Sequence, residues 1–168
     1  MDAEQALLVE ARKFERKLLN FFYRQGVQTS ECEDLLQETY LRLWRYRRRY
    51  RPSAKLSTFL FLMARQVRID ALRRSARREQ RERSWMRERP VETPPDNRGA
   101  RDDVRWALAR LPRTLREVVE LGVFQDLPYA EISDILSIPV GTVKSRMHYA
   151  LKKLKEIFDD KRPSENLG

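Results

Sequence analysis

Arginines and aromatic residues are interleaved in one segment of the chain, a combination that suits nucleic acid. Between residues 42 and 89 there are sixteen arginines and one lysine against four acidic residues, a net charge of +13, whereas the whole chain carries +10. Guanidinium groups pair with phosphates, and aromatic side chains supply stacking surfaces for unpaired bases. The segment therefore favours a polyanion partner, although some of its rings must also fill the core: Trp44, Tyr46, Tyr50, Phe59, Phe61 and Trp85.

Residues for catalysis or metal binding are scarce. The 168-residue chain has one histidine, His148, and one cysteine, Cys32, which excludes an internal disulfide and metal sites built from several such ligands. Its carboxylates are scattered along predicted helices, and no glycine-rich phosphate loop is present. We therefore expect no enzyme, no cofactor, no metal and no small-molecule substrate. Cys32 stands near a helix start that favours a thiolate, but Glu31 and Glu33 oppose this, so a partly buried structural cysteine is the favoured interpretation.

Hydropathy and the N-terminal residues give no membrane signal. No apolar run approaches the roughly 18 residues needed to cross a bilayer. Residues 1–5 lack the basic and apolar segments of a signal peptide. We expect a cytoplasmic protein with no direct membrane insertion.

The apolar spacing predicts an all-α fold, since only five glycines occur and no segment alternates as a strand would. A first helix is expected over residues 3–24. A capping box of Ser30 and Glu33 is expected to begin a second helix that ends near residue 50, before Pro52. Ser57 is expected to cap a third helix that runs to about residue 80, with an exposed basic end beyond Leu72.

Residues 87–100 predict a linker between two small helical domains, residues 1–86 and residues 101–168. The segment has no periodicity and contains three prolines, one asparagine and one glycine. Such a linker permits the domains to be packed together or apart. Short helices are expected after it, at residues 102–109, 113–123, 129–136 and 140–158.

The last two helices are separated by only three residues, Ser137-Ile138-Pro139, which predicts a helix-turn-helix. Ile132, Ile135 and Leu136 of the first helix should face the core, as should Val143, Met147 and Leu151 of the second. In this motif the second helix enters the major groove of DNA. An ordinary helical hairpin with a basic face is the alternative. The residues expected to face DNA are Thr142, Lys144, Ser145, Arg146 and His148.

An acidic helix start stands out in the otherwise cationic N-terminal half. Glu31, Glu33, Asp34 and Glu38 follow one another within eight residues. Stabilisation of the helix dipole accounts for the first two. It does not require Gln37 or Glu38, so a basic protein partner is the second interpretation.

Three motifs resemble one family, the extracytoplasmic-function (ECF) type of bacterial RNA polymerase sigma factor. Residues 130–151, with the lead-in Leu111-Pro112-Arg113, resemble its C-terminal domain, whose second helix reads the minus-thirty-five promoter element. Residues 33–44 resemble its core-polymerase-binding helix, which meets the β′ subunit. Residues 57–74 resemble the helix that holds the nontemplate strand of the melted minus-ten element. The resemblance covers residues 5–85 and 101–158.

The resemblance implies a role for each matching position. The residues implied in core-polymerase binding are Asp34, Gln37, Glu38, Arg42 and Trp44. Those implied in minus-ten DNA binding are Lys55, Ser57, Thr58, Phe59, Phe61, Arg65, Gln66, Arg68, Asp70, Arg73 and Arg74. The family usually has tryptophan at Phe59 and asparagine at Gln66, which leaves the preferred minus-ten sequence open.

The implied function is that of an alternative sigma factor that binds core RNA polymerase, selects promoters and assists their melting. Its implied partners are the β′ and β subunits, duplex promoter DNA, the melted nontemplate strand and an anti-sigma factor. A dimeric repressor is a second hypothesis. The acidic helix of residues 33–44 argues against it, because a repressor does not need a polymerase-binding helix. An RNA-binding or antitermination protein is a third, favoured by the arginines of residues 73–89 but not by the helix-turn-helix.

Overall fold

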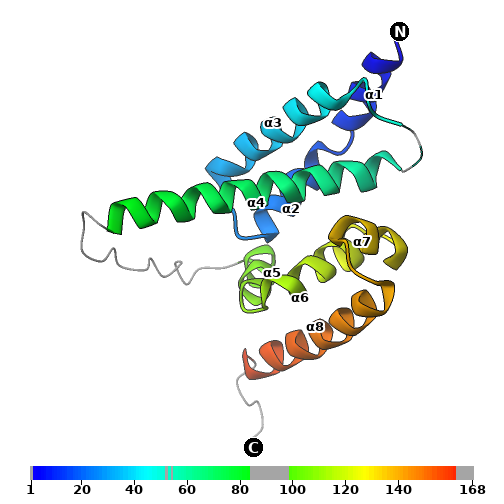
Figure 1. Cartoon of the computed structure of the whole chain (residues 1–168). Coiled ribbons are helices and arrows are strands. Elements are labelled where there is room, and N and C mark those ends of the chain that lie inside the picture. The colour runs from blue at the N-terminus through cyan, green and yellow to red at the C-terminus, as the bar shows by residue number, and fades with distance from the viewer. Residues whose placement is uncertain (1, 52, 54, 84–98, 162–168) are drawn as a thin grey trace, which may run out of the picture.

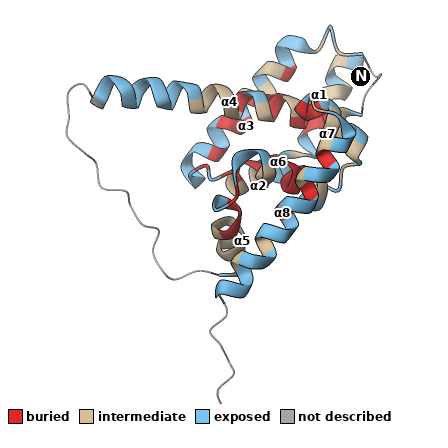
Figure 2. Ribbon diagram, turned by 60° about the horizontal axis from the view of Figure 1, so that its bottom comes forward, coloured by how far each residue is buried: buried red, intermediate tan, exposed pale blue. Residues whose placement is uncertain are grey.

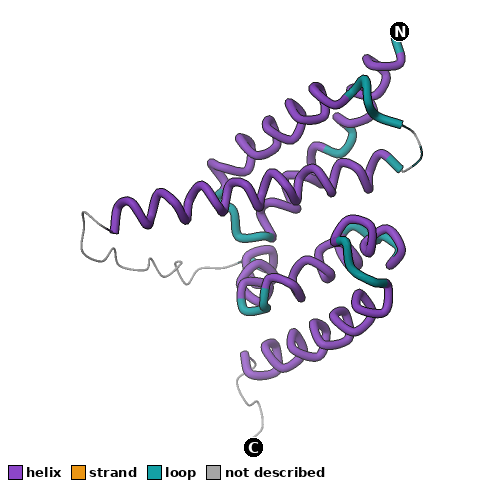
Figure 3. The backbone as a smooth tube through the Cα atoms, in the orientation of Figure 1, coloured by secondary structure: helices purple, strands orange, loops and turns teal. Residues whose placement is uncertain are grey.

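The computed structural model describes residues 2–51, 53, 55–83 and 99–161, and every regular element in these ranges is a helix (Figure 3). The all-α prediction is confirmed. The N-terminal helices are α1 (Ala3–Arg12), α2 (Glu15–Arg24), α3 (Thr29–Tyr46) and α4 (Leu56–Arg83). The C-terminal helices are α5 (Ala100–Ala109), α6 (Arg113–Val119), the π-helix η1 (Glu120–Phe124), α7 (Tyr129–Leu136) and α8 (Val140–Lys161).

The buried apolar stripes of the two groups of helices contribute to one hydrophobic core (Figure 2). In the N-terminal helices the fully buried side chains include Leu18, Phe22, Leu43 and Leu60, one or more from each of α2, α3 and α4. Burying one such side chain is worth about 1.5–3 kcal/mol. In the C-terminal helices the same role falls to Val118, Leu121, Ile132, Ile135, Val143 and Ala150.

Several predicted helix boundaries are wrong. The single helix expected over residues 3–24 breaks at Lys13–Phe14, and the break redirects α2 so that Leu18, Phe21 and Phe22 enter the core. No capping box forms, because α3 begins one residue before Ser30 and the carbonyl of Gln28 accepts the first backbone bonds. Ser57 likewise lies inside α4, which begins at Leu56.

Two later differences concern the C-terminal helices. The helix expected over residues 113–123 divides into α6 and η1. Leu151 was expected in the core, but it is 49% exposed. The buried positions of α8 are Val143, Met147 and Ala150, and residue 151 lies one step of helical rotation away from that stripe.

The far end of α4 projects from the rest of the molecule (Figure 2). Residues 73–82 are all exposed, as expected from the loss of apolar periodicity after Leu72. Pro52, Trp85 and residues 87–98 of the expected linker lie outside the described residues, as does the tail after Lys161.

The N-terminal and C-terminal helices pack against each other, with α5 beside α2 and α7 beside α4 (Figure 1). The contact combines apolar packing with polar bonds. The Tyr23 hydroxyl donates to the Asp102 carboxylate, and Arg105 Nη2 donates to the Val27 carbonyl at 2.9 Å. The arrangement that the sequence left open is therefore a packed one.

Candidate nucleic-acid and partner interfaces

A groove of about 370 Å³ lies between α1 and α3, on the outer side of the N-terminal helices. Two large apolar residues of α3 line it while remaining half exposed, Leu41 at 48% and Trp44 at 47%. The Arg47 guanidinium stacks on the Trp44 ring at 3.7 Å. An exposed apolar groove beside a stacked tryptophan is typical of a protein-binding surface. Its lining residues are Leu8, Arg12, Gln37, Tyr40, Leu41 and Trp44.

The residues implied in polymerase binding fall into two sets. Asp34, Gln37 and Trp44 are exposed on α3. Arg42 is partly exposed, and its guanidinium is engaged in contacts within the molecule: its Nε donates to Glu38 Oε1 at 3.1 Å and its Nη2 pairs with Asp70 Oδ2 of α4 at 2.8 Å. Desolvation lowers the pKa of Arg42, but the bonds to Asp70 and Glu38 outweigh it and the pKa is raised. Arg42 and Asp70, implied in two different interfaces, therefore hold α3 against α4.

Sequence reasoning missed Leu8, Arg12 and Leu41 in this groove. The spacing did indicate Leu41, because this residue is four positions after Gln37 and three before Trp44 and therefore lies on the same side of the helix as both. Leu8 and Arg12 belong to α1, and only the packing of α1 beside α3 brings them there.

The residues implied in minus-ten binding differ in exposure. Phe59 is partly exposed and lies against the rings of Tyr46 and Tyr50, at 5.5 and 5.2 Å between centroids. Phe61 is 1% exposed and packs on Phe21 at 5.7 Å, and Thr58 is buried as well. In this arrangement Phe61 and Thr58 offer no surface to DNA, because they continue the apolar stripe of α4. The other implied residues have exposed or partly exposed side chains: Lys55, Ser57, Arg65, Gln66, Arg68, Asp70, Arg73 and Arg74.

Three of the implied cations are engaged in contacts within the molecule. Arg65 Nε donates to Glu117 Oε1 of α6 at 3.1 Å, and Lys55 Nζ pairs with Glu131 Oε1 of α7 at 3.4 Å. Arg68 Nη2 donates to the Gln25 carbonyl at 3.4 Å. Two cations of the minus-ten surface are thus bound to carboxylates of the C-terminal helices.

A buried ion pair joins the two groups of helices. Arg24 Nε and Nη2 donate to the two carboxylate oxygens of Glu120 at 2.8 and 2.9 Å, and Gln125 donates to the same carboxylate at 3.0 Å. The Glu120 side chain is fully buried. Burial raises the pKa of Glu120, and the bonds from Arg24 oppose this. Sequence reasoning missed the pair, since 96 residues separate its members.

The helix-turn-helix closes through one left-handed residue. Ser137 has φ 55° at the end of α7, and the Ile138 N–H donates to the Ser133 carbonyl at 3.2 Å. Beyond the turn, Val143 and Met147 are buried, as predicted. The opposite side of α8 is exposed at Lys144, Ser145 and His148 and partly exposed at Thr142 and Arg146. Among the described residues neither Lys144 nor Arg146 forms an ion pair.

The described residues hold no cluster of three or more histidine, cysteine, aspartate or glutamate side chains suited to a metal. Cys32 is buried, with its Sγ 3.8 Å from the Val27 carbonyl, which fits the structural interpretation. None of the helices in the described ranges combines the length and the apolar character of a membrane span.

Both groups of helices match known protein families. Residues 11–78 match Sigma-70 region 2, and residues 101–154 match Sigma-70, region 4. The ECF RNA polymerase sigma factor RpoE of Cereibacter sphaeroides is 30% identical over 146 residues, which cover 85% of this chain and 81% of that protein. The ECF RNA polymerase sigma factor SigL of Mycobacterium tuberculosis is 33% identical over 160 residues, covering 91% and 90%.

Solved structures show the same fold. The sigma factor RpoE of Bartonella quintana, crystallised with the anti-sigma factor NepR, aligns with a TM-score of 0.76 at 23% identity, covering 91% of this chain and 96% of that one. CnrH in complex with the cytosolic domain of CnrY aligns with a TM-score of 0.70 at 20% identity, covering 96% and 100%. With two matched regions in order and relatives that span nearly its whole length, this chain belongs to the ECF RNA polymerase sigma factors.

Proposed function

We propose that this sigma factor binds core RNA polymerase, directs it to specific promoters and assists their melting through three separate surfaces. Residues 1–86 form the domain for polymerase and the minus-ten element, and residues 101–168 form the domain for the minus-thirty-five element. The chain supplies binding alone, and the polymerase supplies the catalytic chemistry in the cytoplasm. The observation that carries the proposal is the exposed polar side of α8, directly after a three-residue turn and opposite a buried stripe.

The groove between α1 and α3 is the proposed site for the β′ subunit. Its apolar floor of Leu41 and Trp44 is flanked by the exposed polar groups of Asp34 and Gln37. An apolar centre with a polar rim is the usual organisation of a specific protein interface. Arg42 supports this surface indirectly, because it holds α3 against α4.

The N-terminal part of α8 is the proposed reader of the minus-thirty-five element. Arg146 can form a bidentate contact with guanine, the commonest specific contact in the major groove. Lys144 is a point charge on a flexible stem and suits a phosphate. Thr142, Ser145 and His148 share the same accessible side of the helix.

The melted minus-ten strand is proposed to bind along α4. Phe59 and Gln66 offer a ring and an amide, and Arg73 and Arg74 offer exposed cations. Arg65 can join them fully only after Glu117 has released it, and Lys55, whose side chain is 72% exposed, must exchange its contact with Glu131. Separation of the two domains is therefore part of the proposed activity.

An anti-sigma factor is the proposed regulatory partner. The solved relatives RpoE and CnrH were crystallised as complexes, the first with an anti-sigma factor. The exposed groove of α1 and α3 provides apolar surface for such a partner. A protein seated there would prevent polymerase from binding.

Reconstitution with core polymerase tests the proposal. A double variant, Asp34→Ala with Gln37→Ala, should weaken core affinity measured by fluorescence competition, because both side chains face outward beside the groove. Trp44→Ala should weaken it about thirtyfold, the effect of an aromatic hot spot worth about 2 kcal/mol.

A matched double variant provides the control. Glu79→Ala with Gln80→Ala removes the same chemical groups from the exposed end of α4 and should leave core affinity unchanged. Equal affinities for both double variants and for Trp44→Ala, each with wild-type helicity, would show that the groove is not the polymerase site.

A further inference from the structure

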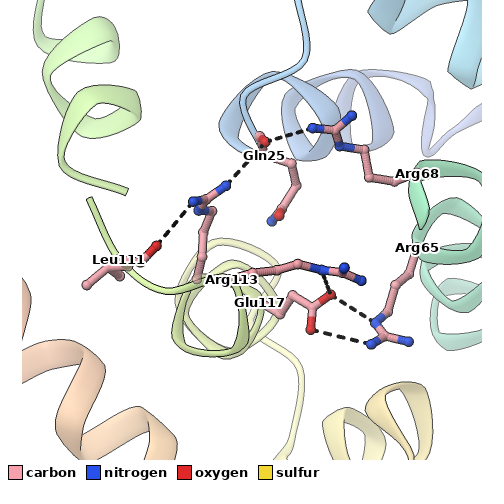
Figure 4. A network of polar contacts seen from close by, with 7 residues as sticks. Gln25, Arg65, Arg68, Leu111, Arg113 and Glu117 are labelled. Atoms are coloured by element: carbon pink, nitrogen blue, oxygen red, sulfur yellow. Dashed lines mark hydrogen bonds and ion pairs between the residues drawn. The ribbon is translucent and has the colours of Figure 1, made fainter. Parts of the chain in front are cut away.

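A small cavity of about 30 Å³ lies where the N-terminal and C-terminal helices meet (Figure 4). One water molecule needs roughly 10–15 Å³, so the space has room for two or three water-sized groups, the size of a small inorganic ion, and is too small for a nucleotide. Phe21, Ile69 and Leu72 form the apolar part of its wall. The polar residues around it are Gln25, Arg65, Arg68, Arg113, Arg116 and Glu117.

These polar side chains are mostly hydrogen-bond donors. Four guanidinium groups face one carboxylate, that of Glu117, whose oxygens are already occupied. Oε1 accepts from Arg65 at 3.1 Å and lies 3.5 Å from Arg113, and Oε2 accepts from Arg65 at 3.5 Å. The side chains around the cavity therefore carry a net positive charge.

Within the described residues, Arg68 and Arg116 donate to backbone carbonyls. Both donate to one atom, the Gln25 carbonyl oxygen, at 3.4 and 3.5 Å. These distances are long for N–H···O bonds, which are commonly about 2.9 Å. Arg116 also donates to the carbonyls of Leu108, Ala109 and Leu111, at and just beyond the end of α5, at 2.9, 3.5 and 3.1 Å. No carboxylate within the described residues forms an ion pair with either guanidinium.

The side chain of Gln25 gives an independent indication of a ligand. This residue is 7% exposed, and its amide nitrogen Nε2 is buried with no hydrogen-bond partner. Figure 4 shows the amide directed into the space that the arginines surround. A buried donor without an acceptor is costly, so an acceptor in the cavity would stabilise the fold.

We infer that the cavity binds a small tetrahedral oxyanion of the phosphate or sulfate class, held by Gln25 Nε2 and by Arg68, Arg113 and Arg116. Water would satisfy the amide but would leave the positive charge uncompensated. Desolvation lowers the pKa of Arg68 and of Arg116, and repulsion from neighbouring guanidinium groups lowers both pKa values further. The charge of Glu31 partly opposes the lowering at Arg68, and the charge of Glu117 partly opposes it at Arg116. An anion would relieve that repulsion.

The site would regulate the packing of the two domains. Gln25 and Arg68 belong to the N-terminal helices, whereas Arg113 and Arg116 belong to α6. An anion that bridges them stabilises the packed state and so keeps Arg65 paired with Glu117. Because ligand binding to one state shifts the equilibrium toward it, phosphate should oppose domain separation.

The test is calorimetric titration of the full chain with inorganic phosphate, at constant ionic strength set by sodium chloride. Phosphate should bind saturably and raise the melting temperature, and chloride alone should not. Arg68→Gln and Arg113→Gln should each weaken phosphate binding about tenfold, the effect of losing one charge-assisted hydrogen bond. Arg113 is partly exposed, so its variant should keep the wild-type helicity.

Arg78→Gln is the matched control, because it removes the same charge from the exposed end of α4 and should bind phosphate like wild type. A titration with adenosine monophosphate is a further comparison, since a free ion fits the cavity and a nucleotide does not. Equal phosphate affinity for wild type, Arg68→Gln and Arg113→Gln would overturn the assignment. Equal effects of phosphate and chloride, or tighter binding of adenosine monophosphate than of phosphate, would overturn it as well.

Discussion

The two surfaces that we propose for DNA differ in how their cations are occupied. On α8, Lys144 and Arg146 form no ion pair within the described part of the chain, and their side of the helix is accessible. At the α4 surface, Arg65 of α4 is paired with Glu117, and Lys55, which precedes α4, is paired with Glu131 of the C-terminal helices. The duplex reader is therefore available in the packed state, whereas the strand-binding surface is partly covered by carboxylates that take the place of phosphates.

The interface between the two groups of helices combines apolar packing with several polar contacts, and the polar contacts can be exchanged for others. The most buried ion pair of this interface joins Arg24 to Glu120, and the Glu120 carboxylate is fully desolvated. A buried pair gains little net free energy after desolvation, although removal of one partner is costly. DNA phosphates or a protein partner can replace such contacts at modest cost, which a large apolar interface would not permit.

Removing the buried carboxylate should produce the largest effect. Glu120→Ala leaves Arg24 without its partner and should lower the free energy of unfolding by about 3 kcal/mol. Urea unfolding followed by circular dichroism measures this loss, and small-angle scattering should show a larger radius. Glu156→Ala, at an exposed position of α8, is the control and should change neither. Wild-type stability and radius for Glu120→Ala would mean that this pair does not hold the domains together.

Changes on α8 should act on promoter choice without opening the interface. Arg146→Ala should lose roughly 1–3 kcal/mol of discrimination at one or two positions of the upstream element, since the guanine contact is bidentate. Lys144→Ala should weaken all sequences about equally and reduce the salt dependence by about one phosphate contact. Transcription from a library randomised upstream separates these effects. An unchanged upstream preference for Arg146→Ala would exclude this helix as the reader.

Release of one cation on α4 should have a smaller effect of opposite sign. Glu117→Gln removes the charge that holds Arg65 and should raise the affinity of the free chain for a single-stranded minus-ten oligonucleotide about fivefold. Fluorescence anisotropy at several salt concentrations measures this gain. Glu79→Gln serves as the control, because it adds the same charge far from Arg65. If both variants gain equally, net charge rather than release of Arg65 is responsible.

The sequence predicted what local patterns encode. The all-α fold and the buried stripe of Ile132, Ile135, Val143 and Met147 follow from helical spacing and are confirmed. Partners far apart in the chain carry no such pattern. Nothing local to Arg24 or Glu120 indicates that they meet. The distinction between Phe59, partly exposed, and Phe61, buried, depends on where α2 lies, which sequence spacing alone does not reveal.

The pH dependence of Glu120 should give the smallest effect, because two causes oppose each other there. Burial raises its pKa above the ordinary value of 4.5, while bonds from Arg24 and Gln125 lower it. For a carboxyl whose folded pKa is raised, the stability it contributes is complete below the unfolded pKa and is lost as pH rises through the folded pKa. Relative to Glu120→Gln, which cannot titrate, wild type should therefore lose stability as pH rises above about 4.5. Urea unfolding of both proteins between pH 4.5 and 8 measures the difference, and other carboxyl groups cancel because both chains share them. A difference that grows in favour of wild type with rising pH would show that the Arg24 pair outweighs burial, and that charge pairing across the interface is stronger than its polar, desolvated setting implies.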